Sequence, residues 1–251
     1  MASISKQFFA VIAGVGAGTG GSVARRFAQA YPVVLLSRHE ESFKDIVAEI
    51  NGEGGKAIGI QADASDSASV KSAFESIKKE LPDFKLAAAI YNASAGRALK
   101  GFLELTNEDL DNSLKGNAHG LFNFAQNTLP LLLDSVDTSP HPPTLIATGA
   151  TASLRGSSKF ADFAAGKFAV RAITQSLARE FGPKGVHVAH AIIDGVIDIP
   201  RVAHLKPQIN NGAPDGLISP AAIADDYWHL HTQHRSAFTQ ELDLRPYVEK
   251  F

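Results

Sequence analysis

The sequence predicts an α/β protein, in which a single doubly wound domain holds a seven-stranded parallel sheet with helices on both faces. Short apolar segments rich in β-forming residues alternate with longer helical patterns along the chain. The first apolar segment runs directly into a glycine-rich loop, as in a βα unit. No linker or repeat divides the 251 residues, so we expect one domain over residues 1–251.

Local patterns of apolar residues place the individual elements. A short β-rich apolar run predicts each strand, and an apolar residue every three or four positions predicts each helix. The expected strands are Phe8–Ala13, Val33–Leu36, Lys56–Ile60, Leu86–Tyr91, Thr144–Thr148, Val186–Ile193 and Thr239–Leu244. The expected helices are Gly20–Ala30, Glu41–Ile50, Ala68–Leu81, Asn107–Leu133, Phe160–Glu180 and Pro220–Thr232.

Three features of the connecting segments complete this fold. Ser219 followed by Pro220 is a favourable helix start, because serine caps a helix and proline suits its first position. Asp134–Pro143 contains three prolines, so we expect a surface loop there. Asp198–Leu217, rich in proline, glycine and asparagine, lies between the last two strands. We expect it to be a mobile lid over a site at the strand ends.

The composition excludes several classes of function. A net charge of −2 gives no electrostatic reason to expect nucleic acid or an anionic membrane as a partner. The absence of cysteine excludes disulfides, thiolate chemistry and cysteine-ligated zinc. We find neither a signal-peptide pattern nor an apolar run of membrane-spanning length, so we expect a cytoplasmic protein.

The glycine-rich loop is the first candidate binding site. It follows the first strand and contains Gly14, Gly16, Gly18, Thr19 and Gly20, with a helix directly after it. Glycines allow the backbone to approach a pyrophosphate closely, and the helix start presents unpaired amides to it. A glycine-rich turn needs no ligand, but its place in the first βα unit of an alternating chain favours a dinucleotide site.

Further motifs follow the glycine loop in a characteristic order. They are Asp63-Ala64 after the third strand, Asn92-Ala93 after the fourth, Asn117 on the long helix and Lys167 on the next helix. Together with the spacing Gly14-x-x-x-Gly18-x-Gly20, this pattern resembles the short-chain dehydrogenase/reductase family over nearly the whole chain. The resemblance implies a Rossmann-like fold that binds NAD or NADP. It also implies an adenine contact at Asp63-Ala64 and catalytic roles for Asn117 and Lys167.

The end of the second strand bears on the choice of coenzyme. In this family an acidic residue at that place binds the ribose 2′-hydroxyl of NAD and repels a 2′-phosphate. Here the strand ends in Ser37 and Arg38, which can donate a hydrogen bond and pair with a phosphate. Although Arg38 can also be read as a solvated loop charge near Glu40 and Glu41, we predict that NADP(H) is the cofactor.

The chain departs from the family at both hydroxyl-bearing catalytic positions. Phe163, four residues before Lys167, stands where the resemblance implies the proton-donating tyrosine. Ala150, thirteen residues earlier, stands where it implies the serine that orients the substrate. The proline-glycine pair after the sixth strand is replaced by Asp194-Gly195, where Gly195 is a candidate cofactor contact. Phenylalanine cannot donate a proton, so ordinary ketone reduction loses its usual acid.

Other residues are candidates for the missing proton donor. Thr148 lies at the end of the fifth strand, and Asp194 lies at the end of the sixth, where it could act as the acid if burial raised its pKa. Packing or loop hydrogen bonding is an alternative role for each. Tyr91 carries a phenol, which we place beside the adenosine half of the cofactor. An iminium substrate would need no acid, because it already carries its charge.

The histidines at the end of the last helix do not form a metal site. Helical geometry puts His229 and His231 on different faces, so His231 and His234 are the only neighbours among the three. We expect solvated histidines there and no bound metal.

Three functions remain compatible with these residues. The first is an NADP(H)-dependent oxidoreductase of the short-chain type, which transfers hydride to a small or medium carbonyl-like or imine-like substrate. The second is a catalytically inactive NADP-binding sensor or scaffold. The third is a non-redox isomerase or cyclase on the same fold. The resemblance also implies a homodimer or homotetramer formed through the two long helices.

Overall fold

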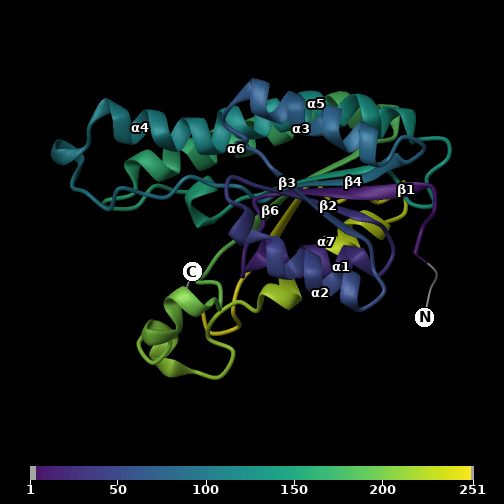
Figure 1. Ribbon diagram of the computed structural model, residues 1–251. Helices are drawn as coiled ribbons and strands as arrows, with labels where there is room; N and C mark the ends of the chain where they lie inside the picture. The colour runs from purple at the N-terminus through teal and green to yellow at the C-terminus, as the bar shows by residue number, and fades with distance from the viewer. Residues whose placement is uncertain (1–3, 250–251) are drawn as a thin grey trace.

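The computed structural model describes residues 4–249 as one seven-stranded parallel sheet between two layers of helices (Figure 1). The strand order is β3-β2-β1-β4-β5-β6-β7, so the chain reverses direction across the sheet between β1 and β4. The strands are β1 (Phe8–Ala13), β2 (Val33–Ser37), β3 (Ala57–Gln61), β4 (Lys85–Tyr91), β5 (Thr144–Thr148), β6 (His187–Ile193) and β7 (Glu241–Leu244).

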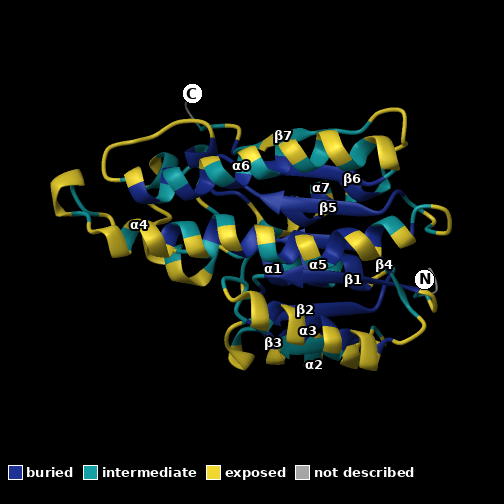
Figure 2. Cartoon of the chain, turned by 90° about the horizontal axis from the view of Figure 1, so that it is seen from above, coloured by how far each residue is buried: buried dark blue, intermediate teal, exposed yellow. Residues whose placement is uncertain are grey.

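Seven α-helices within the described residues cover the sheet. They are α1 (Thr19–Ala28), α2 (Lys44–Gly52), α3 (Ser67–Glu80), α4 (Asn107–Leu114), α5 (Gly120–Asp134), α6 (Ala161–Phe181) and α7 (Pro220–Thr232). Figure 1 shows α1, α2 and α7 on one face and α3, α5 and α6 on the other. In Figure 2 the central strands are buried, whereas the edge strands β3 and β7 are mostly of intermediate burial and the outer faces of the helices are exposed.

Each face of the sheet has its own apolar core, because alternate strand residues point to opposite sides. Ile12 and Leu35 point toward α1 and α7, where they join Val23 and Tyr227. The neighbouring positions, such as Val11 and Val34, point toward α3, α5 and α6. The expected doubly wound fold is confirmed, and the predicted strand ends lie within two residues of the observed ones.

The long helix expected over Asn107–Leu133 is interrupted. Lys115–His119 forms a π-helical turn between α4 and α5. The Tyr91 hydroxyl donates a hydrogen bond of 2.9 Å to the Gly116 carbonyl, which an uninterrupted α-helix would use for the amide four residues later. A Cβ at Gly120 would lie 2.0 Å from the Tyr91 hydroxyl oxygen, so this phenol occupies the space at the turn. A contact with β4 therefore causes the irregularity, and the local apolar spacing does not reveal it.

The carboxyl ends of all seven strands meet at one edge, where parallel α/β proteins bind their ligands. Helix α4 extends beyond this edge, and so does the segment that we expected to be a lid (Figure 1). That segment contains two short 3-10 helices, Pro200–Leu205 and Ile209–Gly212. Its ends meet in a parallel bridge between Ile197 and Ile218. None of the helices in residues 4–249 has the length and hydropathy of a membrane span.

Candidate active site

The glycine loop crosses the edge of the sheet in close contact with the turn after β4. Gly14 has a φ of +90°, and a Cβ added there would lie 2.2 Å from the Ala93 nitrogen. The Asn92 side-chain amide donates a hydrogen bond of 2.8 Å to the Gly14 carbonyl. Gly14 is therefore required for two reasons, its left-handed backbone and the approach of a neighbouring strand end.

The rest of the loop leaves room above the start of α1. A Cβ at Gly20 would meet the Gly14 carbonyl oxygen at 2.3 Å, which fixes how tightly the loop turns. A Cβ at Gly18 would meet Ile199 of the lid segment at 2.8 Å, whereas one at Gly16 would meet nothing within 4 Å. Thr19 is 5% exposed, and its hydroxyl has no hydrogen-bond partner in the described structure. These features fit a pyrophosphate held by the loop and the helix start.

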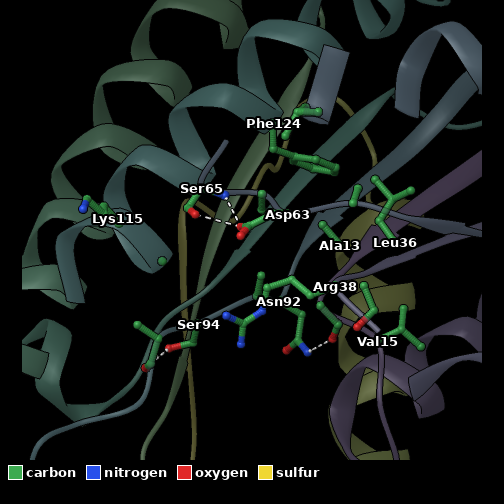
Figure 3. A pocket seen from close by; sticks show the side chains of 18 of the residues that line it. Ala13, Val15, Leu36, Arg38, Asp63, Ser65, Asn92, Ser94, Lys115 and Phe124 are labelled. Atoms are coloured by element: carbon green, nitrogen blue, oxygen red, sulfur yellow. Dashed lines mark hydrogen bonds between the residues drawn. The ribbon is translucent and has the colours of Figure 1, made fainter. Parts of the chain in front are cut away.

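A cavity of about 730 Å³ opens beside this loop, between the ends of β1, β2, β3 and β4 (Figure 3). Six of its lining residues were expected from the sequence to contact the cofactor outside the glycine loop. They are Ser37, Arg38, Asp63, Ala64, Asn92 and Ala93. Gly14 lines it as well. Residues spread over eighty positions of the chain are thus brought to one hollow.

Some polar groups of the cavity already have hydrogen-bond partners within the protein, whereas others do not. Asp63 accepts hydrogen bonds from the backbone amide and the hydroxyl of Ser65, at 2.9 and 2.7 Å. The Ala64 carbonyl accepts one from the Asn123 amide, at 3.1 Å. The Arg38 guanidinium makes no ion pair with any described residue, although its backbone carbonyl accepts a bond from Gln61. On the β2 side of this cavity, the Arg38 guanidinium can therefore pair with an anionic ligand.

Several cavity residues were missed from the sequence. Ser65, Asn112, Lys115, Gly116 and Phe124 all line the same hollow. The Asp63-x-Ser65 spacing is a turn signal that points to Ser65. Asn112, Lys115 and Gly116 come from the region of the π turn, so their position depends on an irregularity that local periodicity does not predict.

Asn117 lies inside the π turn and is completely buried. Its side-chain oxygen accepts a hydrogen bond of 2.9 Å from Ser94, and its amide donates one of 2.9 Å to the Ser113 carbonyl. Ser94, which directly follows the Asn92-Ala93 pair, thus binds the asparagine side chain. Gly166 of α6 packs against the same place, because a Cβ there would lie 2.9 Å from the Asn117 amide nitrogen.

Lys167 and Phe163 lie together on α6, one helical turn apart. The Lys167 ammonium donates a hydrogen bond of 3.0 Å to the Thr148 carbonyl at the end of β5, and it lies 5.8 Å from the centre of the Phe163 ring. Lys167 is 3% exposed, and burial lowers its pKa to about 8. Ala150 follows two residues after Thr148, with an extended backbone at the start of the Thr151–Ser153 3-10 turn.

The structure gives the candidate substitute acids other partners. The Thr148 hydroxyl is buried against the hydroxyl of Tyr227 on α7, 2.8 Å away, on the opposite side of the sheet from α6. The two Asp194 carboxylate oxygens are both engaged. One accepts a short hydrogen bond from Thr151, and the other pairs with Arg245 at 3.0 Å. The residue after it, Gly195, has a φ of +156° and a Cβ position only 2.8 Å from Pro246.

The Tyr91 hydroxyl also has a hydrogen-bond partner of its own. Tyr91 is 1% exposed and donates its hydroxyl to the Gly116 carbonyl, while burial and the nearby Asp63 carboxylate raise its pKa. Its contacts with Gly116 and Gly120 make it a support of the π turn.

His190 of β6 lies under the loop that contains Ala150. The buried His190 ring of β6 would contact a Cβ at Gly149 at 2.2 Å. Its Nδ1 lies 3.2 Å from the Glu241 carboxylate, which Arg171 binds through two hydrogen bonds of 2.7 and 2.8 Å. Burial lowers the pKa of His190 to about 4, so its imidazole is neutral at pH 7.

The histidine cluster at the end of α7 differs from its expected solvated state. His231 is fully buried and hydrogen-bonds Tyr31 and Thr144, each at 3.0 Å. Apolar and aromatic neighbours from α1 enclose it, including Phe27 at 5.6 Å. The expectation that all three histidines are solvated was therefore wrong for His231.

Comparison with known proteins identifies the family. The family model described as short chain dehydrogenase matches residues 9–209. An uncharacterized oxidoreductase of Staphylococcus epidermidis is 30% identical over 246 residues, which is 96% of this chain and 98% of that protein.

Solved structures of short-chain dehydrogenases resemble this chain as well. A short-chain dehydrogenase from Rhodopseudomonas palustris superposes with a TM-score of 0.76 at 32% identity, over 95% of this chain and 99% of that one. A short-chain dehydrogenase from Burkholderia cenocepacia in complex with NADP has a TM-score of 0.82 at 24% identity, over 96% and 97% of the two chains, and shows the fold alone. The chain belongs to the short-chain dehydrogenase family.

Proposed function

We propose that the protein is an NADP(H)-dependent oxidoreductase that reduces a small or medium carbonyl-like or imine-like substrate. The observation that carries this proposal is the cavity at the carboxyl edge of the sheet. It brings the end of β2, with Ser37 and Arg38, next to the glycine loop and the adenine-side Asp63.

The residues around the loop and cavity fit the dinucleotide. Gly16, Gly18 and the unpartnered Thr19 hydroxyl would hold the pyrophosphate, and Asp63 with Ala64 would hold the adenine. Ser37 and Arg38 would bind the 2′-phosphate, because a guanidinium without another ion pair can form a bidentate pair with it. Asn92, Ala93, Gly195 and Lys167 would line the path toward the nicotinamide, which supplies the hydride.

The cofactor proposal is tested by fluorescence titration of the purified protein with NADPH and NADH. We expect NADPH to bind more tightly. Arg38→Ala should weaken NADPH binding by about 10- to 100-fold, since a charge-assisted pair contributes roughly 1.5–3 kcal/mol, and should leave NADH binding unchanged. Arg179→Ala, which changes an exposed arginine on α6, is the matched control. Tighter NADH binding, or an Arg38→Ala variant with full NADPH affinity, would contradict the choice of NADP.

The catalytic half of the site is the part formed by the ends of β5 and β6 together with α6 and the π turn. There Lys167 and Asn117 are the family's residues, whereas Ala150 and Phe163 lack its two hydroxyls. Since the Asn117 side chain is fully engaged by Ser94 and Ser113, we propose that it acts by holding the π turn. The Asp198–Leu217 segment would close over the substrate, because its Ile199 already touches the glycine loop at Gly18.

NADPH consumption with a panel of ketones, quinones and cyclic imines tests the reaction. Turnover with any class supports the oxidoreductase. Tight NADPH binding without consumption would favour the alternative of a catalytically inactive sensor or scaffold. Conversion of a substrate at constant NADPH would favour an isomerase or cyclase.

We also propose that the protein assembles as a homodimer or homotetramer through α5 and α6. A largely apolar groove of about 340 Å³ runs between these helices, beside the exposed Phe122. Its lining includes Leu129, Leu133, Ile173 and Leu177. Sedimentation of the wild type against Ile173→Glu should show an oligomer that the variant loses, and a monomeric wild type would contradict it.

A further inference from the structure

The missing tyrosine leaves open which group would protonate the substrate oxygen. The candidate proton donors named from the sequence all have other hydrogen-bond or ion-pair partners. Asp194 has both oxygens engaged by Thr151 and Arg245. The Thr148 hydroxyl faces Tyr227 across the sheet, and Tyr91 is buried against the π turn. The ammonium of Lys167, by contrast, lies 5.8 Å from the Phe163 ring centre.

We propose that Lys167 itself is the proton donor to the substrate oxygen, in place of the family's tyrosine. This inference rests on the proposed oxidoreductase function and assigns a catalytic step to one of its residues. The geometry that supports it is the shared face of α6, because residues 163 and 167 are one turn apart and point in the same direction. A phenylalanine at position 163 leaves no hydroxyl between the ammonium and the substrate.

The hydrogen bonding of Lys167 leaves protons to give. An ammonium has three donors, and the described structure assigns one of them, to the Thr148 carbonyl. No described carboxylate forms an ion pair with it. The backbone contact holds the amine at the end of β5, next to Ala150, where the substrate oxygen would lie.

The groups that face Lys167 place no unbalanced negative charge beside its ammonium. On the sheet side lies His190, whose imidazole is neutral at pH 7 because burial lowers its pKa to about 4. One turn along α6 lies Arg171, whose charge is balanced by Glu241 of β7. The turn of α4 and α5 against α6 contributes the uncharged Ser113 and Asn117. Burial thus dominates and lowers the pKa of Lys167 to about 8, close to the range in which a general acid works best at neutral pH.

The step balances without a further reagent. The carbonyl carbon receives a hydride from the reduced nicotinamide dinucleotide, which becomes the oxidised coenzyme. The π electron pair moves onto the oxygen, which forms its O–H bond as one Nζ–H bond of Lys167 breaks. The neutral amine then regains a proton from solvent. Because the acid form must be present, ketone reduction should fall as pH rises through about 8.

The decisive variant is Lys167→Arg. Arginine keeps the buried positive charge and a donor for the Thr148 carbonyl, but it does not lose a proton in this pH range. We expect the ratio of ketone to preformed cyclic iminium reduction, measured in single turnovers at saturating NADPH, to fall by about 10²-fold or more, because only the ketone needs an acid. Lys184→Arg, at a surface turn after α6, is the control and should change neither reaction.

A second measurement does not depend on turnover. In the cofactor-free wild type with ¹³C-labelled lysine, NMR should show one lysine side chain that titrates near pH 8. Loss of that signal in Lys167→Arg or Lys167→Met would assign it. If Lys167 instead titrates near 10.5, the proposed acid is overturned.

The remaining outcomes separate this inference from the proposed function. Ketone reduction that stays level through pH 8, or that survives in Lys167→Arg, would overturn Lys167 as the donor and leave the oxidoreductase intact. NADPH consumption with iminium substrates alone would do the same. Failure to bind either coenzyme would overturn both proposals.

Discussion

The two halves of the carboxyl edge differ in how closely they keep to their family. Around β1 to β4, the glycine loop, Asp63 and Asn92 match the family pattern and enclose a cavity. Around β5 to β7, Ala150 and Phe163 stand where we predict the family's two catalytic hydroxyls. On our proposal, binding and chemistry are therefore built on separate strand ends, so one half can change while the other keeps its geometry.

The largest effect should come from closing the glycine loop. Gly14→Ala places a methyl group 2.2 Å from the Ala93 nitrogen at a φ of +90°. Strain and overpacking together should cost about 4 kcal/mol of unfolding free energy, measured by urea denaturation. Gly16→Ala is the matched control, because its methyl group meets no described atom within 4 Å. We expect it to keep full stability and to weaken NADPH binding. Equal unfolding free energies for the two variants would contradict the tight contact between Gly14 and Ala93.

The catalytic half should be the first to open in acid. Burial lowers the pKa of His190 to about 4 and that of His231 to about 3, both from 6.5. Since the folded pKa values are depressed, these groups stabilise the fold fully above pH 6.5, and this stability is lost as pH falls toward the folded values. The share of His190 is on the order of 3 kcal/mol.

Hydrogen exchange at pH 5 against pH 7 should therefore show β6 and α7 opening before β1 to β3. His190→Gln should flatten the fall in unfolding free energy over this range. Uniform opening across the sheet would remove the contrast between the halves.

Restoring the two hydroxyls should sharpen the comparison in activity. We expect Ala150→Ser combined with Phe163→Tyr to raise ketone reduction by about 10²-fold, because a positioned acid contributes at least that much. Single-turnover rates with bound NADPH measure it, and NADPH affinity should stay unchanged. A double variant with no gain would show that Ala150 and Phe163 do not occupy the family's catalytic positions.

The smallest effect should come from the contact between Thr148 and α7. Tyr227→Phe leaves the buried Thr148 hydroxyl without its 2.8 Å partner, which should cost about 1–2 kcal/mol of unfolding free energy. Chemical denaturation measures this loss. The matched control is Tyr247→Phe, on a residue that is 77% exposed, and it should cost nothing measurable.

The sequence predicted the layers of the fold well because each strand and helix carries its own period. The order of the strands and the carboxyl-edge site then follow from the βα alternation. The π turn at Asn117 escaped prediction because its cause, the Tyr91 hydroxyl, comes from a strand twenty-five positions earlier. The burial of His231 escaped for the same reason, since α1 encloses it. Periodicity describes a segment, whereas these features depend on contacts between segments.

Within the site, sequence order located the residues but not their hydrogen bonds. Asp194 was a candidate acid until Arg245, fifty-one positions later, was seen to pair with it. The hydrogen bond from Ser94 to the Asn117 side chain was likewise not predicted. Partners of this kind are set by side-chain directions at strand ends, which no spacing rule specifies.

Thr148 joins the two helical layers through a single residue. Its carbonyl receives Lys167 from one layer, and its hydroxyl receives Tyr227 from the other. A displacement of α7, which directly follows the Asp198–Leu217 segment, would thus be transmitted mechanically to the amine across the thickness of the sheet. Substrate closure on one side of the molecule could in this way set the reactivity of a group on the other.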